Sequence, residues 1–198
     1  MIRGAGTLPA AMALMPSQAS KARPTMQTDE KAVILNELEL GRDAFLEAVR
    51  AVPEDLAATS PAPGRWSVVE CVEHIAVSED FLLTGITQAK PSGAPVVNAR
   101  REAAILARGA DRTNPLISPE VGRPTGRVTT LADAIESFLA VRERTIRFVE
   151  ACEEDLRAEP MTHPLLGTIN CQEALLLIAV HPRRHASQIR EITEGGGL

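Results

Sequence analysis

Two histidines near the end of the chain, His181 and His185, have the spacing of a metal-binding pair. Side chains four residues apart lie on one face of an α-helix, one turn apart, so both imidazoles can reach one ion. They share an apolar stripe with the period of a core-facing helix, formed by Cys171, Leu175, Ile178, Ile189 and Ile192. The pair is therefore predicted to point into the protein interior.

A third histidine, His74, lies in an earlier helical segment, close to Val68, Cys71 and Ile75. Two imidazoles from one helix and one from another would hold a divalent ion (Zn, Ni or Fe) and leave coordination positions open. This hypothesis requires the two helices to face each other. In the alternative interpretation, each histidine is a hydrogen-bonded core residue.

The open positions of such a site would activate a water molecule, or would hold a low-molecular-weight thiol as the nucleophile. Gln188 follows His185 by three residues and projects on the same face, where it would orient a water or a small-molecule substrate. A hydrogen bond within the core is the alternative role for its amide. No inward-facing carboxylate stands out as a general base, so the residues do not separate a hydrolase from a thiol transferase.

Composition limits the class of protein. The 198 residues are 44% apolar and 24% charged, which suits one domain with a substantial core. Only 3% are aromatic, so the core must be aliphatic, as in helix-on-helix packing. A net charge of −5 argues against a nucleic-acid partner, and no apolar run is long enough for a membrane span. Three widely spaced cysteines indicate reduced thiols in a cytoplasmic protein.

Four long amphipathic segments follow one another, and no strand-like alternation appears. We expect helices over residues 29–52, 67–90, 131–152 and 171–193, which together form an all-α four-helix bundle. Ser67 and Glu70 form a capping box at the start of the second helix, and Asn170 and Glu173 form a similar pair before the fourth. On the third helix the charged residues are predicted to face outside, namely Arg142, Glu143, Arg144 and Arg147.

A long insert separates the second and third helices. It contains a short predicted helix over 97–108 and an irregular, arginine-rich stretch over 109–127. Such inserts are often lids over functional sites. The arginines would then meet an anionic substrate, or they would simply face solvent. We expect residues 1–27 to form a loose N-terminal tail, 28–194 the bundle and 195–198 a C-terminal tail.

Three motifs, in order, resemble those of the DinB-like family of four-helix bundles. The stretch from Gly64 to Ile75 resembles the family's "kWS..E..eHl" signature, and His163 to Gly167 resembles its "HP.lG" loop. The stretch from His181 to Ile189 resembles its terminal "H..rH..QI" signature. The resemblance covers about residues 28–192. It implies a bundle that binds a divalent metal through three histidines, which map onto His74, His181 and His185.

Relatives in this family include thiol-dependent S-transferases and a thiol-dependent maleylpyruvate isomerase, so the resemblance implies a metal-dependent hydrolase or thiol transferase. The fourth histidine, His163, is not a usual ligand in the family and is interpreted as structural, with a place at the mouth of the site as the alternative. A non-catalytic bundle that binds a small molecule or dimerises is the competing hypothesis. The run from Leu175 to Val180 is apolar on more than one face, which suits a homodimer surface as well as a core.

Overall fold

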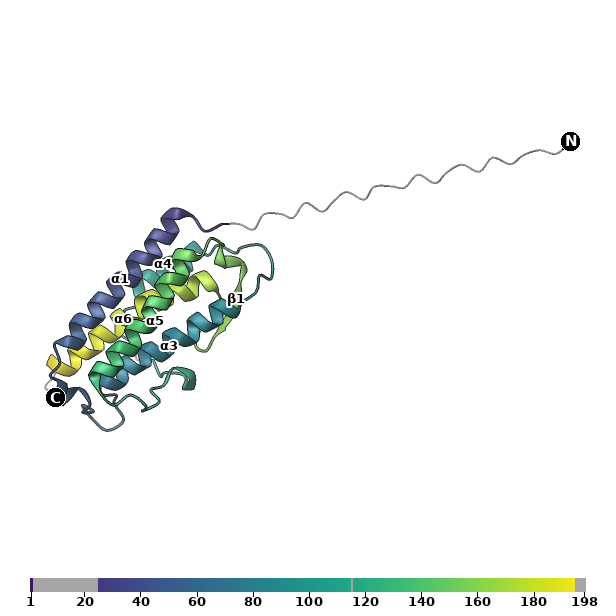
Figure 1. The fold of residues 1–198 in the computed structure, drawn as a ribbon. Coiled ribbons are helices and arrows are strands. Elements are labelled where there is room, and N and C mark those ends of the chain that lie inside the picture. The colour runs from purple at the N-terminus through teal and green to yellow at the C-terminus, as the bar shows by residue number, and fades with distance from the viewer. Residues whose placement is uncertain (2–24, 115, 195–198) are drawn as a thin grey trace.

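The computed structural model describes Met1, residues 25–114 and residues 116–194. Four long helices pack side by side in this part of the chain (Figure 1), namely α1 (Thr28–Arg50), α3 (Val68–Gln88), α5 (Leu131–Ala151) and α6 (Cys171–Glu194). Helix α6 packs against α1 and α3, and α5 packs against the same two helices. The predicted all-α four-helix bundle is confirmed, and α3 and α6 are neighbours within it.

The helix ends follow local sequence signals closely. Each long helix begins and ends within two residues of its predicted bounds. The Glu70 backbone N–H donates to Ser67 Oγ, and the Ser67 N–H donates to the Glu70 carboxylate, which is the predicted capping box. The reciprocal pair of Asn170 and Glu173 is also present.

Shorter elements fill the connections. Helix α2 (Glu54–Ala57) follows α1, whereas α4 (Ala99–Arg108) and the 3₁₀ turn η1 (Glu120–Gly122) belong to the insert between α3 and α5. A second 3₁₀ turn, η2 (Leu156–Ala158), precedes an antiparallel hairpin of β1 (Pro160–His163) and β2 (Gly167–Asn170). Helix α4 packs on α6, and η1 packs on α3, so the insert lies over the two helices that carry the histidines.

The hairpin contradicts the prediction that the chain has no strands. Each strand has only four residues, which is too short for alternation to stand out from the sequence. His163 pairs with Gly167 across the turn, and Gly167 has a positive φ of 68° that favours glycine.

The core is aliphatic, as the composition predicts. Phe45 and Phe138 form its one aromatic pair among the described phenylalanines, edge to face with centroids 5.2 Å apart. The apolar run in α6 is buried within the chain itself, except that Leu177 is half-buried. It therefore belongs to the core rather than to an exposed dimer surface. Helix α1 approaches α6 so closely that a Cβ on Gly41 would collide with the carbonyl oxygen of Ala179.

Arg142 is buried, which contradicts its predicted outward position on the third helix. Helix α6 continues through Pro182, which has no N–H to donate to the carbonyl of Ile178, one turn earlier. Arg142 donates to that carbonyl at 3.2 Å and to the Leu38 carbonyl at 2.8 Å. It also forms a 2.7 Å ion pair with buried Glu79. One side chain thus satisfies the backbone gap and links all four helices.

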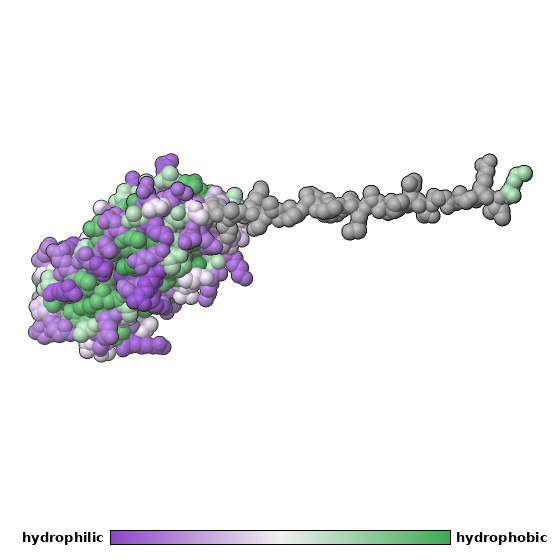
Figure 2. All heavy atoms as spheres, turned by 45° about the horizontal axis from the view of Figure 1, so that its top comes forward, coloured by the Kyte–Doolittle hydropathy of each residue, from purple (hydrophilic) through white to green (hydrophobic). Residues whose placement is uncertain are grey.

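Most of the predicted N-terminal tail, and residues 195–198, lie outside the described residues. Met26 is buried, and its N–H donates to the carbonyl of Glu153 at 3.0 Å. No helix in the described ranges is both long and apolar enough to cross a membrane. The face shown in Figure 2 carries hydrophilic residues over much of the bundle, with hydrophobic areas between them.

Candidate metal centre

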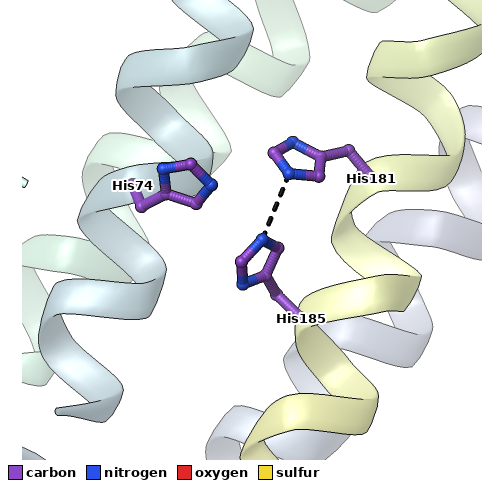
Figure 3. A group of neighbouring side chains, drawn as sticks. All are labelled: His74, His181 and His185. Carbon is purple, nitrogen blue, oxygen red and sulfur yellow. Dashed lines mark hydrogen bonds between the residues drawn. The ribbon is translucent and has the colours of Figure 1, made fainter. Parts of the chain in front are cut away.

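Helices α3 and α6 bring the three predicted histidines together (Figure 3). His74 comes from α3, and His181 and His185 come from successive turns of α6. The ring centroid of His74 lies 5.1 Å from that of His181 and 4.7 Å from that of His185, which are themselves 4.8 Å apart. One potential ligand atom from each ring lies within 4.8 Å of the other two. Because α3 packs against α6, the two helices that carry the histidines face each other, as the metal-site hypothesis requires.

The backbone of the insert orients the ring of His74. Its Nδ1–H donates a hydrogen bond to the carbonyl oxygen of Gly122, and the hydroxyl of Ser78 lies 3.3 Å from the same nitrogen. A carbonyl only accepts, so Nδ1 must carry the proton and Nε2 must carry a free lone pair. This is the tautomer of a metal-ligating histidine held by an outer hydrogen bond.

The other two imidazoles face each other. Nε2 of His185 lies 3.1 Å from Nε2 of His181, whereas Nδ1 of His185 is buried without a hydrogen-bond partner among the described residues. Two nitrogens that each bind one zinc ion at about 2.0–2.1 Å must lie within about 4 Å of each other. The facing nitrogens and the all-imidazole donor set therefore fit a shared divalent ion.

Burial keeps these imidazoles uncharged. It lowers the pKa of His181 and His185 well below the ordinary value, and the neighbouring histidines and arginines lower both further. Burial also lowers the pKa of His74, although the Gly122 carbonyl opposes this shift. Neutral imidazole is the form that binds metal, so all three rings are ready as ligands near neutral pH.

The histidines open onto a cavity of about 1070 Å³. Its walls come from α3, α6, the insert and the turn of the hairpin. Arg108, Arg112 and Arg123 of the insert line it, in agreement with the predicted cover. Arg101, which also belongs to the insert, forms a 3.6 Å ion pair with Glu173 and is not among the lining residues. Cavities of this size hold small organic molecules.

A model of the DinB superfamily matches residues 37–189. The chain belongs to the DinB superfamily. A solved structure, YfiT from Bacillus subtilis, is similar with a TM-score of 0.55 and 17% sequence identity, over 89% of this chain and 93% of that one. That protein is described as a probable metal-dependent hydrolase with an unusual four-helix bundle topology. At this identity the likeness shows the fold. A comparison with curated proteins found no match.

Two further residues that the sequence singled out in this DinB-superfamily chain, Gln188 and His163, line the cavity, whereas Cys71 does not. Gln188 lines the cavity, and its Oε1 accepts a hydrogen bond from Arg112 at 3.0 Å. His163 also lines the cavity, while its Nδ1 accepts from the backbone N–H groups of Leu165 and Leu166 in the hairpin turn. His163 therefore both supports the hairpin turn and lies at the cavity, so the two predicted alternatives do not exclude each other. Cys71 lies in the core outside the cavity lining, and burial raises its pKa to about 12.

Trp66 contributes to the site as well as to the helix entry. It lies directly before the capping residue of α3 and packs against the core cluster there. Its ring centroid also lies 4.8 Å from that of His74, and it lines the cavity. It therefore limits the space in which the His74 ring can turn.

The roles of Glu73 and Gly122 in this DinB-superfamily chain did not follow from the sequence alone. Glu73 is buried and accepts hydrogen bonds from the Thr125 N–H at 3.1 Å, the Thr125 hydroxyl at 2.5 Å and the Gly126 N–H at 3.2 Å. It fixes the loop that places the Gly122 carbonyl beside His74. A Cβ at Gly122 would lie 2.9 Å from Ser78 Oγ, so a side chain at this position would displace the Ser78 hydroxyl beside His74. The sequence signal for Glu73 was its place directly before His74, which made it a candidate hydrogen-bond acceptor near the site.

Proposed function

We propose that this protein is a metal-dependent enzyme in which His74, His181 and His185 bind one divalent ion at the wall of the cavity. The observation that carries the proposal is the convergence of three neutral, inward-facing imidazoles on a space open to a small molecule. The description of the similar YfiT structure as a probable metal-dependent hydrolase supports it. Zinc, nickel and iron(II) all accept this donor set.

A divalent ion held by three imidazoles supplies a Lewis acid that lowers the pKa of a water or thiol at its open positions. Residues of the chain itself would hold the ligands of this ion in position. The Gly122 carbonyl holds the tautomer of His74, and the Trp66 ring packs beside it. The only carboxylate among the described lining residues is Asp111. We propose that the nucleophile is either water or a low-molecular-weight thiol.

Metal content and ligand variants test this proposal. Protein purified without an affinity tag and reconstituted with zinc, nickel or iron(II) is expected to hold one ion per chain by elemental analysis. The variants H74Q and H185Q should lose it, because glutamine does not replace an imidazole ligand. The control H163N, which keeps an acceptor for the hairpin turn, should retain it.

Two outcomes would refute the metal centre. The first is wild-type protein that takes up none of the three metals. The second is a folded H185Q variant with the same metal content as the wild type. A cavity that binds small molecules without metal would then favour the competing hypothesis of a non-catalytic binding module.

A further inference from the structure

The charges that line the cavity are strongly unbalanced. The described lining residues include a single carboxylate, Asp111, and five arginines, which are Arg65, Arg108, Arg112, Arg123 and Arg184. The whole chain has a net charge of −5, so this concentration of positive charge runs against its overall sign. A cavity lined by one sign of charge attracts ligands of the opposite sign.

Two of these arginines, Arg184 and Arg112, join the histidine helix to one segment of the insert. Arg184 directly precedes His185 on α6, and its Nη2 donates to the carbonyl of Asn114 at 3.0 Å. Arg112 lies two residues before Asn114, and its Nη1 donates to Oε1 of Gln188 at 3.0 Å. Gln188 itself follows His185 by three residues on α6. The two guanidinium groups and Gln188 therefore border the same part of the cavity wall.

The two arginines differ in how their charge is balanced. Arg112 forms two parallel hydrogen bonds with the Glu191 carboxylate, at 2.9 and 3.0 Å, which fix its guanidinium plane. Arg184 has no carboxylate within salt-bridge distance in the described part of the chain, and its acceptor there is a backbone carbonyl. Its charge is thus held in place beside the histidines, and Asp111 and Glu191 act on it only from beyond salt-bridge distance, which leaves it available to an anion.

Another part of the lining is apolar and exposed. Several large hydrophobic side chains that line the cavity are also at least 38% exposed, namely Phe81, Leu116, Ile117, Val121, Leu165 and Leu166. They come from α3, from the insert and from the hairpin turn. Exposed apolar residues that gather around one cavity mark a ligand-binding surface.

We propose that the cavity binds an amphipathic organic anion, whose carboxylate, phosphate or sulfonate group contacts Arg184 and Arg112 and whose aromatic or alkyl body lies on the apolar rim. This inference rests on the proposed function only in treating the histidine cluster as the reacting centre. The anion subsite itself is built from side chains that need no metal.

Calorimetric titration of metal-stripped protein with four probes tests the proposal. 3-Phenylpropionate and phenyl phosphate carry both charge and ring, 3-phenylpropionamide carries the ring alone, and propionate carries the charge alone. We expect both aromatic anions to bind at least about tenfold more tightly than the amide or propionate, because a hydrogen bond to a charged group is worth about one such factor.

Variants assign the effect to residues. R184Q should weaken 3-phenylpropionate about tenfold and leave the amide unchanged, whereas I117S should weaken both. The matched control is R144Q, which removes an exposed arginine that pairs with Asp80 outside the cavity lining. All variants are compared at equal fractions of folded protein, judged by thermal unfolding.

The proposal is overturned if the amide binds as tightly as the acid, if R184Q matches the wild type, or if none of the probes binds. Binding that appears only after metal is restored, and that R184Q does not change, places the anion on the metal. The subsite is then wrong while the proposed function stands. If the protein takes up no metal but binds the anion, and R184Q abolishes that binding, the subsite stands and the proposed function is wrong.

Discussion

At the scale of single residues, the site depends on where each imidazole keeps its proton. The Gly122 carbonyl fixes the proton of His74 on Nδ1, while burial favours the uncharged form of all three rings. The i,i+4 spacing predicted the pairing of His181 with His185 because one helix determines it. The partner of His74 was not predictable, because Gly122 lies 48 residues further along the chain in an irregular loop.

The lowered histidine pKa values predict how stability depends on pH in metal-free protein. Below the unfolded pKa of about 6.5, the unfolded chain binds protons that the folded rings do not, so the free energy of unfolding must fall as pH falls. Each such group contributes up to about 1.4 kcal/mol per pH unit. Urea unfolding between about pH 7.5 and 5.5 measures this slope.

The variant H185Q removes one of these groups and should show a shallower pH slope than the wild type. H163N is a suitable comparison and should change the slope less, because burial lowers the pKa of His163 but does not place it well below the ordinary value. Equal slopes in wild type and H185Q would show that His185 is not a buried neutral base.

At the scale of elements, sequence signals within one helical turn predicted the helix ends. They did not predict the hairpin or the buried contacts of Arg142 that connect the helices. Ser67 and Glu70 predicted the start of α3 because both groups lie within one turn. The hairpin was missed because its strands are short. Arg142 was misplaced because a charged residue is usually exposed, whereas here the carbonyl left free by Pro182 and the Glu79 carboxylate supply buried acceptors.

Replacing Arg142 tests this link between the helices. R142M leaves the buried Glu79 carboxylate with Thr145 as a donor but without its cation, and the Ile178 carbonyl without its donor, so it should lower the free energy of unfolding by about 3–5 kcal/mol. Burial already raises the pKa of Glu79, with Arg142 opposing the shift, so the unpaired carboxyl would take up a proton more easily still.

Urea unfolding of R142M, E79M and the double variant, with R144M as an exposed control, measures these terms. The double variant should recover part of the loss, because it removes both buried charges together. A change below about 1 kcal/mol in R142M would contradict a central role for the pair, since breaking a buried ion pair costs several times more.

The loop after η1 offers a second test at this scale. E73Q keeps the size of the side chain but loses the charged acceptor of the Thr125 and Gly126 N–H groups. The Gly122 carbonyl should then be held less firmly beside His74, and metal affinity should fall by roughly tenfold, as for outer hydrogen bonds at other metal sites.

Chelator competition measures the dissociation constant of the metal in E73Q. The control E143Q changes a carboxylate that pairs with Arg147 on the exposed side of α5. Equal affinities in E73Q and E143Q would show that the loop does not position the histidine.

At the scale of the whole molecule, the candidate site lies where separate parts of the chain meet. The bundle brings α3 against α6, and the insert and the hairpin close a cavity over the histidines. Composition and periodicity predicted the helical class, and the histidine spacing and the family resemblance both supplied the candidate ligand set. Neither predicted that Arg65 and Arg184 join the arginines of the insert at the cavity, because those two residues come from parts of the sequence far from the insert.

A metal that joins two helices should stabilise the entire bundle. At a free concentration one hundred times its dissociation constant, an ion that binds only the folded chain adds about 2.7 kcal/mol to the free energy of unfolding. For a chain of this size we expect the melting temperature to rise by roughly 5–10 °C. Thermal unfolding with and without zinc measures the shift in the wild type and in H74Q and H185Q. Because His74 is the one proposed ligand on α3, a shift that survives in H74Q would mean that the ion bridges no helices and binds to α6 alone.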